Sequence, residues 1–259
     1  MTTGRLIRAY LAEARYESLR ALRAPSFAIP FLLLPVALYI FFGVYMAGSM
    51  SHGDPNAALC MFVNFSVFGV MGPGMFGFGM FVAIEREQGL LTLKRAQPVP
   101  AASYVLAKMF MSMLFAVLIM ITMIAAGVLL GHVPLSAWQF LAIAAIDIAG
   151  ALPFCAVGLL VGVWVSGKTA PGIVNLLYLP MMYLGGLFLP MPKAIQPAEL
   201  FSPAYYLDKL GLIVAGAPSL DQMAQATFNH GSPLLHAAVL AGITLVLGGL
   251  AVRRLARLG

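Results

Sequence analysis

The chain has 259 residues, of which 61% are apolar and only 9% are charged, whereas a soluble domain carries roughly 25% charged residues. A water-soluble core of this size cannot use so much apolar surface, so the composition excludes an ordinary soluble domain. The formal net charge of +6 is explained by contact with anionic lipid headgroups, and it requires no nucleic-acid partner.

The first segment, Thr3–Arg23, is predicted to form an amphipathic helix. Its apolar side chains fall close to one stripe of the helical wheel, and its arginines lie elsewhere around it. A helix of this kind lies along a membrane surface. We expect residues 1–25 to be an interfacial anchor, which either serves only that purpose or also contacts a cytoplasmic partner.

Six apolar runs follow, each long enough to cross a ~30 Å hydrocarbon core as a helix. They are Ser26–Gly48, Ala58–Ile84, Tyr104–Leu130, Ala137–Val165, Ala170–Pro190 and Pro233–Val252. In lipid, helices satisfy their own backbone hydrogen bonds. The sequence therefore predicts a single all-α integral membrane domain, with spans one to five in residues 26–190 and span six with a tail in 233–259.

Two spans carry unusual residues. The second contains five glycines around Pro73 in VFGVMGPGMFGFGMF, which predicts either close helix packing or a hinge. The fourth contains Asp147, and an ionised group at that depth costs about 2.5–3.5 kcal/mol. Asp147 is therefore either hydrogen-bonded to a neighbouring helix or part of a substrate path. Asn64 and Asn175 are weaker candidates of the same kind.

Residues 191–232 are too apolar for an ordinary loop and too rich in proline for one spanning helix. Irregular backbone at membrane depth is tolerated only against protein or a water-filled cavity. We expect this segment to form short re-entrant helices that pack on the spans from the extracytoplasmic side.

With cytoplasmic termini, the six spans place thirteen of the fifteen lysines and arginines on the cytoplasmic side. Only Lys193 and Lys209 then lie outside, as the positive-inside rule requires. The polar insert between the second and third spans is also cytoplasmic in this arrangement. Its residues Glu85–Arg95 are predicted to form a short helix with exposed leucines, broken by Pro98 and Pro100. Such a helix either docks a soluble partner or only anchors the two spans.

Motifs for chemistry are absent from the sequence. It has no GxxxxGK[ST] phosphate loop, and no GxSxG or HExxH arrangement. Neither its four histidines nor its two cysteines have metal-ligand spacing. We expect no catalytic residue, no metal site and no cofactor in this chain.

The insert EREQGLLTLKRAQPVPAASYVLAK resembles the cytoplasmic stretch of type-2 ABC exporter permeases. The likeness runs through Glu85, Arg86, Glu87, Gly89, Leu90, Leu93, Pro98, Val99, Tyr104 and Lys108. Thr92 and Lys94 are mild departures from the family pattern. A second likeness follows the fifth span, through Gly186, Phe188, Pro190, Pro192, Pro203 and Tyr206.

The resemblance implies a permease subunit of an exporter, drug- or antibiotic-efflux-like, in the inner membrane. It would pair with a separate ATPase subunit, which binds ATP and Mg, and with a second permease subunit. The ATPase-coupling residues would be Glu85, Arg86, Glu87, Gly89, Leu90 and Leu93. A lipophilic or lipid-linked substrate would pass Asp147, Asn64, Asn175, Phe42 and Tyr183.

Two other functions are compatible with the residues. One is a proton-coupled secondary transporter that uses Asp147 as its carrier acid. The other is a membrane scaffold or accessory subunit that transports nothing.

Overall fold

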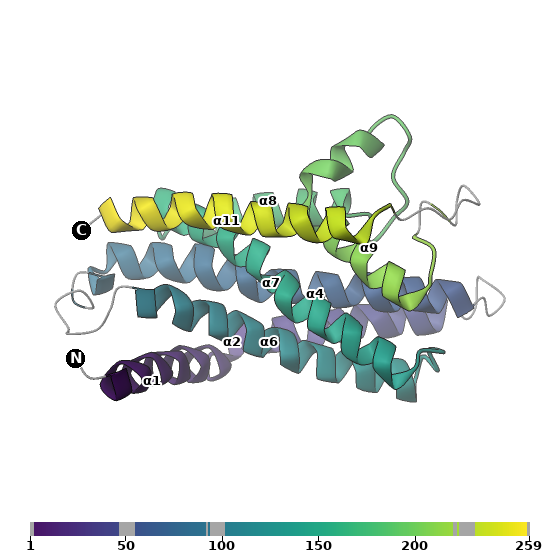
Figure 1. Cartoon of the computed structure of the whole chain (residues 1–259), viewed down its shortest axis with the longest axis horizontal. Coiled ribbons are helices and arrows are strands. Elements are labelled where there is room, and N and C mark those ends of the chain that lie inside the picture. The colour runs from purple at the N-terminus through teal and green to yellow at the C-terminus, as the bar shows by residue number, and fades with distance from the viewer. Residues whose placement is uncertain are drawn as a thin grey trace.

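The computed structural model describes residues 3–46, 55–91, 93, 102–219, 222 and 231–257. These residues form an elongated bundle whose long helices run roughly side by side (Figure 1). Five helices are long and apolar enough to cross a membrane. All regular elements in the described part of the chain are helical, which confirms the all-α membrane fold.

The N-terminal part of the bundle consists of α1 (Thr3–Leu22) and α2 (Pro25–Leu38). Helix α2 continues as a π-helix, η1 (Tyr39–Met46), where the sequence predicted one uniform helix. At the junction the N–H of Tyr39 donates to the carbonyl oxygens of both Pro35 and Val36. Helix α1 packs on α6 (Ala102–Leu129) and contacts α2 at its end.

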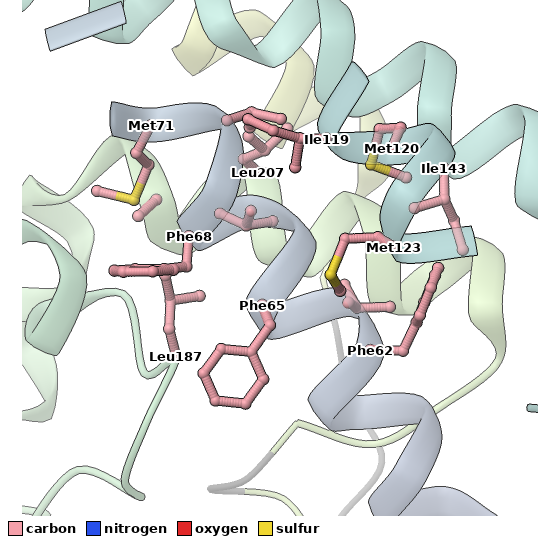
Figure 2. Close-up of a cluster of buried hydrophobic side chains, with 14 of the residues drawn as sticks. Phe62, Phe65, Phe68, Met71, Ile119, Met120, Met123, Ile143, Leu187 and Leu207 are labelled. Carbon is pink, nitrogen blue, oxygen red and sulfur yellow. The ribbon is translucent and has the colours of Figure 1, made fainter. Parts of the chain in front are cut away.

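Helix α4 (Pro55–Glu87) forms the centre of the bundle, because it contacts α2, α6, α7, α8 and α9. Figure 2 shows the large side chains of its buried face packed against neighbouring helices. The labelled side chains are Phe62, Phe65, Phe68 and Met71 of α4, Ile119, Met120 and Met123 of α6, with Ile143, Leu187 and Leu207.

Glycines bring α4 close to α7 (Ala137–Trp164). A Cβ placed on Gly158 would lie 2.6 Å from the carbonyl oxygen of Met75, and one on Gly74 would lie 3.1 Å from the backbone nitrogen of Cys155. Side chains at these glycines would push the two helices apart. The glycine-rich stretch around Pro73 therefore forms a close helix contact.

The run predicted to form the fifth span is helical only over α8 (Ala170–Leu184), which has 15 residues. At 1.5 Å per residue this helix is about 22 Å long, shorter than a ~30 Å hydrocarbon core. The chain then turns back through η2 (Gln196–Phe201) and α9 (Pro203–Ala215). Helix α9 is largely buried against α4, α7 and the last helix, α11 (Pro233–Arg257).

Both ends of the chain lie at the same end of the bundle (Figure 1). The end of α4, the start of α6 and the end of α7 lie there as well. We call this the basal end, and it contains Arg20, Glu87, Tyr104, Trp164 and Arg257. The residues that resemble the ATPase-coupling stretch are therefore at the same end as the two termini.

Candidate functional site

Five side chains from three helices meet at the basal end: Glu17 and Arg20 of α1, Glu85 of α4, and Tyr104 and Lys108 of α6. Nζ of Lys108 lies 3.0 Å from Oε2 of Glu17 and 3.1 Å from Oε1 of Glu85. Arg20 forms an ion pair with the same Oε1 of Glu85. The Tyr104 hydroxyl donates to Oε2 of Glu85 at 2.5 Å. We call these five residues the basal ion cluster.

The basal ion cluster is balanced in charge, and all of its residues except Arg20 are buried. Lys108 is 0% exposed, and Glu17 and Glu85 are at most 2% exposed. Removing such charges from water costs several kcal/mol per ion unless each is paired. Burial lowers the pKa of Arg20, but the charge of Glu85, its hydrogen bond to Arg20 and the charge of Glu17 together raise the pKa by more, so the guanidinium stays charged. The cluster thus fastens α1 to the ends of α4 and α6.

Arg86 and Glu87 face a different neighbour. The Arg86 guanidinium donates to the carbonyl oxygen of Val163, and to that of Val165 at 2.8 Å. These carbonyls belong to the end of α7, where the helix itself supplies no donors. Glu87 is exposed and lies beside Gly167, in the turn that follows α7. A Cβ placed on Gly167 would lie 2.7 Å from Oε2 of Glu87. Glu85–Glu87 therefore connect α4 with both α1 and α7.

The helix predicted over Glu85–Arg95 is divided in the structure. Helix α4 runs through Glu87, and Gly89 ends it with a φ of +72°, a left-handed conformation that glycine adopts without strain. Helical backbone resumes at Leu90, and the N–H of Leu93 donates to the carbonyl of Gly89 at 3.2 Å. Residues 94–101, which include Pro98, Val99 and Pro100, lie outside the described part of the chain.

Gly89, Leu90, Leu91 and Leu93 lie beyond the end of α4, and we call these four residues the basal segment. Leu91 packs against an apolar cluster that includes Phe78 and Tyr104. Leu93 is 63% exposed and Leu90 is half-buried. The basal segment therefore offers an apolar surface at the end of a helix that ion pairs hold in place.

An apolar groove of about 360 Å³ opens between α2, α4 and α8, and we call it the α8 groove. Neighbouring aromatic rings run along it, with centroids 5.4 Å apart for Phe31–Phe76, 5.5 Å for Phe76–Tyr178 and 5.8 Å for Tyr178–Phe68. Asn175 also lines the groove, and its side chain is exposed. The α8 groove can therefore accept an apolar molecule and offer it one amide.

The other residues predicted for a substrate path do not line the α8 groove. Asn64 is 1% exposed and donates from Nδ2 to the carbonyl of Leu187 at 3.0 Å, which holds the turn after α8 against α4. Phe42 stacks on Phe65 with centroids 5.8 Å apart, and its ring lies 6.4 Å from that of Phe188, which lines the groove. Tyr183 is on α8 and 37% exposed.

Asp147 lies inside the bundle and is 0% exposed. Ser66 of α4 lies beside it, but the Ser66 hydroxyl donates to the carbonyl of Val63 at 2.8 Å. Within the described residues, neither carboxylate oxygen of Asp147 has a hydrogen-bond partner. Asp147 is thus a polar group enclosed between α4 and α7.

The sequence interpretation missed the contribution of α1 to this site. Glu17 and Arg20 were assigned only to a surface helix, yet they pair with Lys108 and Glu85. The available signal was Lys108 itself, a charge inside an apolar run that needs a partner. Among the described residues, no group of three or more His, Cys, Asp or Glu side chains could hold a metal ion.

Five long apolar helices define a multi-pass membrane protein. Residues 8–215 match the family model described as "ABC-2 type transporter", and the chain belongs to this family. It is also 29% identical over 209 residues to the Bacillus subtilis (strain 168) protein named "Putative transport permease YvfS", covering 78% of this chain and 84% of that protein. The chain is therefore a transport permease, the membrane part of an ABC transporter, and the family implies an ATPase partner.

Replacing Lys108 by Met should strongly destabilise the permease, because it leaves two carboxylates buried without their ammonium. Breaking a buried ion pair in this way costs about 3–5 kcal/mol. The measurement is the midpoint temperature of unfolding in detergent, monitored by size-exclusion chromatography of samples heated to increasing temperatures. Lys193→Met, at an exposed lysine, is the matched control. Equal midpoints for the two variants would contradict a structural role for the cluster.

Proposed function

We propose that this permease exports a lipophilic compound, drug-like or lipid-linked, across the inner membrane, driven by ATP hydrolysis on a separate subunit. The basal end and both termini face the cytoplasm in this proposal. The observation that carries it is the basal segment, which exposes Leu93 beyond the end of a helix that ion pairs hold to its neighbours. The distribution of lysine and arginine along the chain supports the orientation.

The basal segment is suited to transmit force from the ATPase. Leu90 and Leu93 would contact a groove on that subunit, and the exposed carboxylate of Glu87 would lie at the edge of the contact. Glu85 is paired with α1 and α6, and Arg86 is bonded to the end of α7. A displacement of the basal segment would therefore move several helices together. ATP and Mg²⁺ would be bound by the partner, and this chain would need no cofactor.

The α8 groove is the proposed substrate path. Its aromatic rings suit a lipophilic substrate, and Asn175 would supply a hydrogen bond to a polar group on it. A second permease copy, of the same or a related chain, would close the groove. The exposed side chains of α8 beside it support this, in particular Leu176, Leu179 and Tyr183. Asn64 and Asp147 are buried inside the bundle and do not line this groove, so in this proposal they would not touch the substrate. Phe42 would extend the aromatic surface beside Phe188.

Replacing Leu93 by Asp should reduce co-purification of the ATPase subunit with the tagged permease by about tenfold or more, because it places a charge in an apolar contact. Leu93 is 63% exposed, so the permease itself should fold and insert normally. Leu200→Asp is the control, since Leu200 is 57% exposed on η2, far from the basal end. Undiminished co-purification of the Leu93→Asp variant would rule out this docking surface.

Replacing Leu179 by Trp should block the α8 groove, which Leu179 lines. Transport should fall by about tenfold or more, while the ATPase subunit still co-purifies, because the basal end is untouched. Leu177→Trp makes the same change on the same helix, at a residue that is 38% exposed, does not line the groove and is not assigned to the contact with the second copy. If both variants transport equally well, the path does not run through this groove.

A proton-coupled transporter is the second candidate function, and one observation favours it: Asp147 is fully buried without a hydrogen-bond partner among the described residues. The isosteric change Asp147→Asn separates the two functions. Under the ATP-driven proposal, the variant should transport within about twofold of the parent, and ATP depletion should stop both. Transport that is lost in Asp147→Asn, and that in the parent follows the proton gradient and survives ATP depletion, would favour the second candidate.

A further inference from the structure

A second apolar groove, of about 350 Å³, lies between α11 and the helices α4, α6 and α7. We call it the α11 groove. Its lining includes Phe78 of α4, Met109 of α6, Cys155 of α7, and Leu245, Gly249 and Val252 of α11. Gly249 keeps its α11 side open, since a Cβ placed there would meet nothing within 4 Å. The groove is separate from the α8 groove and shares none of its lining residues.

Exposed arginines continue from the α11 groove toward the basal end. Arg253 lies four residues after Gly249, and Arg257 lies four residues after Arg253, so the three positions follow one line along the helix. Arg254 is also exposed, and its Cζ lies 4.7 Å from the centroid of the Trp164 ring. Helix α11 contains no Asp or Glu between Pro233 and Arg257. The end of α11 beyond the groove is therefore basic, and the exposed Trp164 lies beside Arg254 there.

We propose that the α11 groove binds one anionic phospholipid, with an acyl chain along the groove and the phosphate on Arg253 and Arg257. An apolar depression on a membrane helix suits an acyl chain, and a guanidinium binds a phosphate through paired hydrogen bonds. Trp164 is 65% exposed beside Arg254, as is typical of tryptophan at the level of the headgroups. This inference does not depend on ATP-driven export or on the α8 groove.

The position of Trp164 provides a direct probe. Trp138, the second tryptophan, begins α7 at the other end of the bundle, so a Trp138→Phe background leaves Trp164 as the sole tryptophan. The full-length permease would be placed in mixed phosphatidylcholine and phosphatidylglycerol vesicles in which one lipid at a time carries bromine near the headgroup end of its acyl chains. Bromine quenches tryptophan fluorescence at short range, so the two series compare the lipids at this one site.

The two quenching series should give phosphatidylglycerol an apparent affinity for the Trp164 site that is roughly fivefold or more above that of phosphatidylcholine. A roughly fivefold difference is what one arginine contact with an anionic lipid provides. Arg253→Gln with Arg257→Gln should bring this preference to about one. Arg8→Gln with Arg15→Gln is the matched control, because it removes the same charge from exposed sites on α1 and should leave the preference unchanged.

Filling the groove tests the acyl-chain part of the site. Gly249→Leu should abolish the preference, whereas Gly242→Leu, on the same helix at a position equally open but outside the groove, should keep it. Equal quenching by both lipids in the parent, or a preference that survives the Arg253 and Arg257 changes, would overturn the proposal. A preference that survives Gly249→Leu would rule out binding of an acyl chain in the groove. The preference would then come only from the surface charge of the arginines. Quenching by neither lipid would mean that protein covers the groove, which also overturns it.

Discussion

The ammonium of Lys108 is the constraint on which the basal end depends. It is fully buried with a carboxylate on each side, 3.0 and 3.1 Å away. A buried charge is tolerated only when its partners are held close to it, so α1, α4 and α6 have little freedom to separate there. Arg86 adds α7 to the same assembly through the carbonyl oxygens at its end. The surface helix and the spans therefore meet as one mechanical unit.

The rest of the bundle combines rigid contacts with open grooves. Close glycine contacts join α4 to α7, and large apolar side chains join α4 to α6 (Figure 2). The α8 and α11 grooves remain open on the outer helices. The proposed roles follow this division: the basal end receives force, one groove passes substrate, and the other holds lipid. The two grooves differ in their polar neighbours: an exposed amide lines the first, and exposed arginines follow the second along α11.

Much of the fold could be predicted, because runs of apolar residues have few stable arrangements in lipid. The predicted spans therefore coincide with helices, although α8 stops at Leu184, well before Pro190. That difference arises because hydropathy reports the medium around a segment and does not report where its backbone turns. The change to a π-helix at Tyr39 depends in the same way on local geometry. Predictions for residues 94–101 stay predictions, since they lie outside the described part of the chain.

The sequence by itself determined that this is a helical membrane protein, and its ordered motifs indicated the permease family that the comparison confirms. Only the tertiary structure decided which way its charged residues face. Glu85 was predicted to belong to an exposed coupling helix, yet it is 1% exposed and paired with Arg20 and Lys108. These three charged residues are far apart in the sequence, and the role of each depends on which helix packs beside it. Helix packing makes that choice, because a charge leaves water only where an opposite charge is already in place.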